Sequence, residues 1–348
     1  MISKFLGFFT KLFRFHKMKM FFFVASNLFC LFLLFPYSDL SDLASSQVAQ
    51  ATRNQVNLQF EQLGFGFMPQ FGMEMDKVSL DLSLGAVQLP NLKMESFGVA
   101  PNIFYSIWNG IFGGITPANA VGTIKKIQAL GLFDGNLYAY IKASQKLGAS
   151  DKAILLDLNF EDIHLQELTK YLKSAGKSPF VAKGVAQFVS DITLDTVFKE
   201  QPNGSYNLNV KKFSIPPTTY KVPLGGLPLD LPAPGLDFKV VDFKGKIEDR
   251  NLTIKKGTLG DIKDELFAEV TGKMVLNVKP GGRFDPGGYD FVVNLTLKQS
   301  FLDKLGSYGA ILGGLIGEKH KRATNDGERY HFRVKGRNFK TNPTFSNP

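Results

Sequence analysis

The chain has 348 residues, is 44% hydrophobic and carries a formal net charge of +10. The charge lies at the two ends: the first 19 residues contribute +5, and Glu318–Lys340 holds eight Lys or Arg against three acids. The sequence between these ends is therefore neutral, which argues against a basic stripe for nucleic-acid binding. A single cysteine excludes a disulfide framework and a thiolate metal site.

An apolar run close to the N-terminus is the first element of the chain. No charged residue lies between Phe21 and Phe35, and five Lys or Arg but no acid precede it. This pattern predicts a transmembrane anchor at residues 20–36, a basic cytoplasmic N-terminus at residues 1–19, and residues 37–348 on the other side of the membrane. The anchor side chains are Phe21, Phe22, Phe23, Leu28, Leu31, Leu33 and Phe35.

The length of this run leaves alternatives open. It is shorter than the roughly 20 residues of a full transmembrane helix, so a cleaved signal peptide is one alternative. The small-x-small site Ala49-Gln50-Ala51 lies too far downstream for ordinary cleavage, which favours a retained anchor. Translation that starts at Met18 would give the anchor an ordinary, short basic start.

After the anchor, a helix is followed by alternating strands. Tyr37–Asn54 has helical spacing, and Ser38 is its candidate N-cap. From Val56 onward apolar and polar residues alternate, which is typical of antiparallel strands with one solvated face. The predicted strands are Val56–Leu63, Val78–Leu84, Gly135–Ala143, Ile154–Ile163, Val185–Leu194, Tyr206–Phe213, Phe238–Ile247, Leu252–Thr258, Leu266–Val278, Tyr289–Leu297 and Tyr330–Phe339.

Three segments with helical patterns interrupt the alternation. Ala100–Leu130 is a mixed insertion, in which Phe104–Phe112 is amphipathic and Pro117–Leu130 predicts a short helix. Helical spacing also predicts helices near Leu165–Ser174 and within Ser300–Glu318. The glycines of the last segment predict a mobile or tightly packed helix rather than a stiff one.

Six prolines in Ile215–Phe238 exclude an interior strand there. A domain linker is one interpretation, but the same strand pattern continues on both sides, so we expect an extended segment along one edge of the sheet. The whole pattern predicts a mainly β fold with a few helices. We expect a long, curled antiparallel meander, an open groove or half-pipe, with short amphipathic helices packing on it.

The sequence contains no arrangement of residues that is typical of a catalytic, phosphate-binding or metal-binding site. Gly176-Lys177-Ser178 lacks the glycine pattern of a phosphate-binding loop, and the four histidines include no pair at metal-ligand spacing. Glu161 and Asp162 are neighbours in a predicted strand and would point to opposite faces. We therefore predict no catalytic, cofactor-binding or metal-binding residue, and a protein that is not an enzyme.

Two stretches resemble a known family. The order of anchor, helix and the VNLQFEQL strand, with the ending GERYHFRVKGRNFKTNP, resembles the GspN family of type II secretion proteins. The stretch FDGNLYAYIKAS at Phe133–Ser144 is similar to a family strand, with Asp134 in place of a glycine. The positions that match the family's closing strand are Gly327, Tyr330, Phe332, Val334, Gly336 and Pro343.

The resemblance implies a component of the type II secretion machinery in the bacterial inner membrane, single-pass, with a cytoplasmic N-terminus and a periplasmic bulk. Its implied partners are the inner membrane and other type II secretion components, and no nucleic acid. The family is also similar to AsmA- and TamB-like proteins, which implies a second hypothesis: a β-groove that carries lipid between envelope membranes. The alternative for the same apolar residues is an ordinary dry core beneath the amphipathic segments.

Overall fold

The computed structural model of the chain describes most of the sequence. The residues described are 17–34, 41–51, 56–66, 72–84, 87–88, 90–103, 121–174, 180–196, 199–224, 227–279, 283–306, 309, 314, 316–338 and 343–348.

Most of these residues belong to one 17-stranded sheet. Its strands are β1 (Val56–Gln59), β2 (Gln62–Gly66), β3 (Gly72–Leu84), β4 (Val87–Gln88), β5 (Leu92–Pro101), β6 (Ile124–Leu132), β7 (Gly135–Leu147), β8 (Ser150–His164), β9 (Lys183–Asp195), β10 (Asn203–Ile215), β13 (Leu236–Glu248), β14 (Asn251–Leu259), β15 (Leu266–Lys279), β16 (Arg283–Lys298), β17 (Lys321–Thr324), β18 (Gly327–Gly336) and β19 (Thr344–Ser346).

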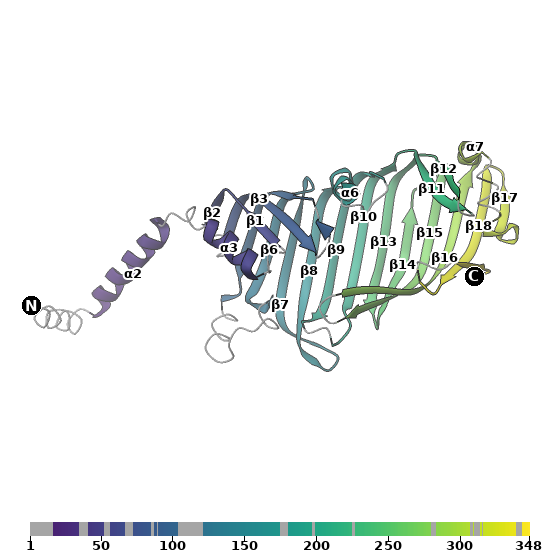
Figure 1. Cartoon of the computed structure of the whole chain (residues 1–348). Coiled ribbons are helices and arrows are strands. Elements are labelled where there is room, and N and C mark those ends of the chain that lie inside the picture. Colours follow the sequence, from purple (N-terminus) through teal and green to yellow (C-terminus); the bar gives the residue numbers. More distant parts are fainter. Residues whose placement is uncertain are drawn as a thin grey trace, which may run out of the picture.

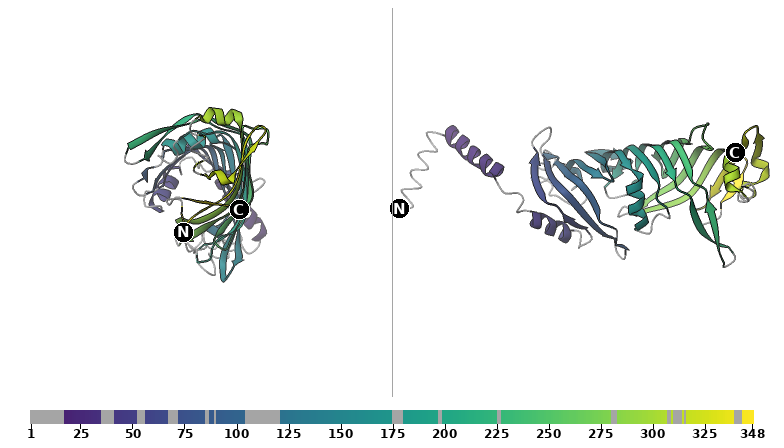
Figure 2. Two further views of the ribbon diagram at one scale, coloured as in Figure 1. Left: turned by 90° about the vertical axis from the view of Figure 1, so that its right-hand side faces the viewer. Right: turned by 90° about the horizontal axis from the view of Figure 1, so that it is seen from above.

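The sheet is antiparallel and grows in chain order. Strand β3 pairs with β5, consecutive strands pair with one another from β5 through β10, and β10, β13, β14, β15, β16 and β18 continue the order. Figure 1 shows this as a progression of colours along the sheet, and Figure 2 shows that the sheet curls. The sheet does not close, because β1 and β2 pair with β3 at one end while β17 and β19 pair with β18 at the other. The predicted mainly β, open antiparallel meander is therefore confirmed.

Tight turns and bulges explain how neighbouring strands join and bend. Phe133 and Asp134 connect β6 to β7, and Asp249 and Arg250 connect β13 to β14; all four have positive φ. Two-residue turns of this kind match the right-handed twist of the strands they join. Register shifts in β8 and in β10 mark bulges, which bend the bulged strand and help the sheet to curl.

Four α-helices lie in the described part of the chain: α2 (Lys17–Leu34), α3 (Ser41–Ala51), α6 (Leu165–Ser174) and α7 (Gln299–Leu305). Helix α6 begins and ends where the helical spacing predicts, and α3 covers the described part of the predicted Tyr37–Asn54 helix. In the Ser300–Glu318 segment α7 ends at Leu305, where Gly306 follows with a φ of 54°; residues 307–308, 310–313 and 315 lie outside the described residues. Short 3₁₀ turns lie at Val121–Thr123 and Glu318–His320.

The predicted short helix at Pro117–Leu130 is wrong over its described part. Residues from Ile124 onward form β6, which pairs with β5 on one side and with β7 on the other. Hydrogen bonding to two neighbouring strands outweighs a weak local helical preference. The amphipathic Phe104–Phe112 stretch lies outside the described residues.

The proline-rich segment forms a separate hairpin, β11 (Thr218–Leu224) paired with β12 (Leu227–Ala233). The expected extended segment along a sheet edge is therefore wrong, whereas the exclusion of an interior strand is confirmed. Strands β10 and β13 pair directly at the base of the hairpin, where Ile215 lies opposite Leu236. Figure 2 shows the hairpin projecting from the body of the sheet, so its prolines interrupt no ladder of the main sheet.

The predicted anchor forms helix α2, which stands apart from the sheet in Figure 1. Its 18 residues correspond to roughly 27 Å at the α-helical rise, slightly less than a hydrocarbon core. Within the described residues, no helix combines the length and the apolar character needed to cross a membrane. The structure therefore supports a helix at this position and gives no support to a full span.

Candidate functional site

One face of the sheet is apolar across nine strands. The strand register places one residue from each strand in a continuous row that runs from β7 to β18. Eight of the nine are apolar and the ninth is glycine; an extent of about 38 Å follows from the spacing of strands. The middle row consists of Leu137, Phe160, Phe188, Leu208, Phe243, Gly257, Val270, Val293 and Phe332.

A second apolar row lies beside the middle row on the same face. The residues of this flanking row are Ile163, Ala186, Val210, Val241, Leu259, Ala268, Leu295 and Tyr330. Between such rows, the alternate residues point to the opposite face. There the residues in register are polar: Asp157, Asp191, Ser205, Lys246, Thr253, Lys273, Asp290, Lys335 and Thr344.

The two apolar rows differ in burial. Six of the eight flanking-row residues are buried, including Ile163 and Val210 at 4% exposure each. In the middle row, every side chain from Leu137 to Val293 is only half-buried. The flanking row therefore behaves as a dry core, whereas the middle row keeps apolar surface in contact with solvent.

Helices cover only parts of the apolar face. Val48 of α3 packs at the β1–β6 end, Leu165 and Leu168 of α6 pack near the flanking row, and Phe301 of α7 is buried at the β16–β18 end. These contacts form three separate clusters of buried residues. The cluster next to α6 also includes Phe160, Leu208 and Phe243 of the middle row, which stay only partly buried.

Glycines on the apolar face lie beneath aromatic rings of the neighbouring strand. The ring of Phe243 lies opposite Gly257, where a Cβ would approach a ring carbon to 2.7 Å. A side chain at the glycine would displace the ring. The glycine therefore leaves room for the aromatic ring of the neighbouring strand to lie flat across both strands. The same arrangement joins Tyr206 with Gly245, Phe291 with Gly272, and Tyr289 with Gly336.

Tyr206 places a phenol hydroxyl on this face, since it lies two residues before Leu208 of the middle row on β10. Its hydroxyl donates a hydrogen bond to the carbonyl oxygen of Thr253 at 3.4 Å, and burial raises the pKa of Tyr206. The group is therefore neutral at physiological pH. The centre of the apolar face carries no ionised tyrosine.

The family-like ending forms β18 and packs against the C-terminal end of the apolar face. Tyr330 is fully buried, Phe332 is 6% exposed and contacts the ring of Phe345, and Val334 packs on the same cluster. Gly327 begins the strand with a φ of 144°, and Gly336 ends it. Pro343 is exposed beside β19. The structure thus brings five of the six residues together on one strand, in packing roles.

Tyr330, Glu328 and Lys321 form a partly buried polar triad at this end of the face. The Tyr330 hydroxyl donates to Glu328 at 2.5 Å, and the Lys321 ammonium lies 2.6 Å from the same carboxylate. Burial alone would raise the pKa of Glu328, but the hydrogen bonds from Lys321 and Tyr330 outweigh it and the net pKa is lowered. The carboxylate is therefore charged and paired at neutral pH.

The anchor residues lie far along the chain from this strand. Phe21, Phe22 and Phe23 are exposed in α2, each by about two thirds. Leu28, Leu31 and Leu33 are also within α2, whereas Phe35 lies outside the described residues. Three adjacent exposed phenylalanines are unusual for a helix in water and indicate an apolar partner surface.

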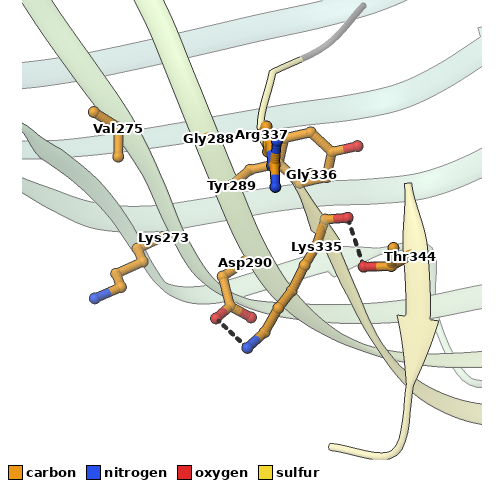
Figure 3. A pocket seen from close by; sticks show the side chains of 9 residues that line it. All are labelled: Lys273, Val275, Gly288, Tyr289, Asp290, Lys335, Gly336, Arg337 and Thr344. Carbon is orange, nitrogen blue, oxygen red and sulfur yellow. Dashed lines mark hydrogen bonds and ion pairs between the residues drawn. The ribbon is translucent and has the colours of Figure 1, made fainter. Parts of the chain in front are cut away.

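The polar face carries a depression of 590 Å³ at its C-terminal end, drawn in Figure 3. Asp290 lies within it. Arg333 donates two hydrogen bonds of 2.6 Å to the Asp290 carboxylate, and Lys335 lies 3.4 Å away. The hydrogen bonds from Arg333 lower the pKa of Asp290 most, burial opposes them, and Lys335 lowers it further. Sequence reasoning missed this group because its members come from β15, β16, β18 and β19.

The pairing of Asp290 predicts a contribution to acid stability. A carboxyl whose folded pKa is lowered stabilises the fold above its unfolded pKa of about 3.9 and loses this effect as pH falls through the folded value. Asp290→Asn should therefore cost about 1 kcal/mol at pH 7, after allowance for solvent screening. The variant should also show a smaller loss of stability between pH 5 and pH 2, measured by urea unfolding. Asp237→Asn, an exposed carboxyl on β13, is the control and should leave the profile unchanged.

Side-chain clusters that could bind a metal ion are absent from the part of the chain that the structure describes. No group of three or more His, Cys, Asp or Glu side chains there could hold a metal ion. His331 lies on the polar face and hydrogen-bonds to Asn294 of the adjacent strand.

Comparisons with family models, with curated proteins and with solved structures found no match. The resemblance to the GspN family therefore rests on the quoted residues alone.

Proposed function

We propose that this protein is a non-enzymatic, membrane-associated protein that holds lipid acyl chains along the apolar face of its curled sheet. The observation that carries the proposal is the difference between two adjacent rows. Six of the eight flanking-row residues are buried, whereas seven of the nine middle-row residues, all except Gly257 and Phe332, are only partly buried. Exposed apolar surface of this extent is costly in water and is typical of a binding surface.

Three features support an acyl chain as the ligand. The middle row is long and narrow, contains no charged side chain, and is made of Leu, Phe and Val with one glycine. The paired glycines and rings make its surface even, which suits an unbranched chain better than a bulky ring system. The phenol of Tyr206 is neutral, so no charge opposes burial of a hydrocarbon.

The lipid content of the native protein tests this proposal. Full-length protein purified in mild detergent should retain lipid that is released only by delipidation, and intact-mass spectrometry should show the difference. Delipidated protein should take up a fluorescent long-chain fatty acid. Equal mass and equal extractable lipid before and after delipidation would rule the proposal out.

Attachment to the bacterial inner membrane through α2 is part of the same proposal. The three exposed phenylalanines and the preceding Lys17 and Lys19 support insertion of this helix with its N-terminus in the cytoplasm and the sheet in the periplasm. Local thinning of the bilayer would accommodate the short apolar run. Fractionation should place the full-length chain in the membrane pellet, and Phe21→Asn/Phe22→Asn/Phe23→Asn should release it.

A second candidate function is a role in type II secretion, which the resemblance of β18 to the GspN family favours. The sheet would then act as an interaction surface for other secretion components. Deletion of the gene should cause a selective loss of proteins from the medium, restored by the gene but not by a version lacking residues 18–35. Unchanged export together with altered envelope lipid would favour the lipid role instead.

A further inference from the structure

The depression on the polar face is built from neighbouring positions of four strands. Lys273 of β15 lies opposite Asp290 of β16, which lies opposite Lys335 of β18, which lies opposite Thr344 of β19. Arg337, just past the end of β18, also lines it. Figure 3 shows these side chains around a common space. Its volume of 590 Å³ falls within the range of sites that hold small ligands.

The charges in the depression do not balance. Arg333 and Asp290 form a two-bond pair that is neutral as a unit. This leaves Lys335, whose contact with Asp290 is longer at 3.4 Å. Lys273 and Arg337 have no ion pair or side-chain hydrogen bond among the described contacts. Three cationic groups from two strands and the chain just beyond β18 therefore surround a space that contains a single, already paired carboxylate.

The backbone around these cations is held in place. The Thr344 hydroxyl donates a hydrogen bond of 3.2 Å to the carbonyl of Lys335 and fixes β19 against β18. Gly288 and Gly336 add no side chain to the lining, and a Cβ at Gly288 would lie 3.0 Å from the carbonyl oxygen of Gly336. The paired Asp290 limits the movement of Lys335. Lys273 and Lys335 therefore project from strands that are paired with β16, and Arg337 directly follows β18.

We propose that this depression binds a phosphate group. A phosphate group presents at least two non-bridging oxygens that accept charge-assisted hydrogen bonds from guanidinium and ammonium groups, and its negative charge offsets part of the surplus of three cations. The source is either a free phosphate compound or the headgroup of a phospholipid, and both present the same chemistry. Its cations Lys273 and Lys335 alternate with the residues of the apolar rows and lie on the opposite face, although Tyr289 and Gly336 of the apolar face also line the depression.

Titration of the full-length protein with inorganic phosphate and with vesicles tests the site. One vesicle preparation contains phosphatidylglycerol, and the other contains phosphatidylcholine only. The test variant is Lys273→Gln/Arg337→Gln, which removes two cations without touching the Asp290–Arg333 pair. The matched control is Lys211→Gln/Lys246→Gln, which removes the same charge from exposed positions on the same face.

The expected result is a loss of about tenfold in affinity for the test variant and little change for the control. If the test variant loses affinity for inorganic phosphate, the ligand is a free phosphate compound. If it loses affinity only for phosphatidylglycerol vesicles, the ligand is a phospholipid headgroup. Equal losses in the test and control variants would reveal general charge attraction and overturn the site. Absence of binding to both probes, or binding of polyglutamate in place of phosphate, would overturn it as well. Fatty-acid uptake should be unchanged in every variant, which separates this proposal from the acyl-chain function.

Discussion

Gly272→Ala should lower the free energy of unfolding by about 3 kcal/mol. Gly272 has a φ of 141°, which side-chain-bearing residues rarely adopt, and forcing a residue into such a conformation costs of order 1–3 kcal/mol. A Cβ there would also lie 2.7 Å from the Cα of Phe291 and would meet the carbonyl oxygen of Asp290. Both contacts are with the backbone of β16, which cannot rotate away, so a cost of overpacking is added. Urea unfolding followed by circular dichroism measures the change.

Gly64→Ala is the matched control for this prediction. Gly64 also lies in a strand, but its φ is not positive and the nearest atom to a Cβ is the Glu74 carbonyl oxygen at 3.9 Å. We expect a change within about 0.5 kcal/mol, because the added methyl meets only ordinary van der Waals contact. If both variants lost the same stability, the close approach of β15 and β16 at Gly272 would not be the cause.

Phe188→Gln should abolish most lipid retention, with a decrease of about tenfold in fatty-acid affinity. Phe188 is the third of the nine residues in the middle row, opposite Phe160 and Leu208, and its ring meets the Phe160 ring edge to face at 5.9 Å. A primary amide in this place interrupts the apolar path and must be desolvated when a hydrocarbon covers it. Lipid extraction and fatty-acid titration of the folded protein measure the loss.

Two further variants separate lipid binding from stability. Val189→Gln changes the next residue of the same strand, which is 51% exposed on the opposite face, and should leave lipid binding unchanged. Phe188→Leu replaces the ring with a smaller side chain but keeps the surface apolar, so this variant should retain most of the lipid. A loss in Phe188→Gln that is no greater than in Val189→Gln would show that the middle row is not the binding surface.

Local patterns were sufficient to find most of the sheet. The alternation in Gly135–Ala143 and Ile154–Ile163 predicted β7 and β8, because one buried and one solvated face impose a period of two on the sequence. The amphipathic spacing of Leu165–Ser174 predicted α6 for a similar reason. The pattern failed at Pro117–Leu130, where pairing with β5 and β7 decided the structure.

The candidate sites were only partly visible in the sequence. The family-like residues Tyr330, Phe332 and Val334 share one strand, so their common face follows from alternation alone. The Asp290–Arg333 pair joins residues 43 positions apart, and no local signal connects them. The same holds for Lys273 and Lys335, which become neighbours of Asp290 only through the register of three strands.

The sequence by itself determined that the chain forms an open antiparallel meander with one apolar face, since the periodicity and the short spacing of its strands require it. It also determined the apolar helix near the N-terminus. Only the tertiary structure decided which apolar residues are buried and which stay half-exposed, because this depends on where α3, α6 and α7 pack. It also decided that the proline-rich strands pair with each other rather than with the main sheet. The cationic depression was decided in the same way, since its residues come from strands distant in the chain that are aligned in register.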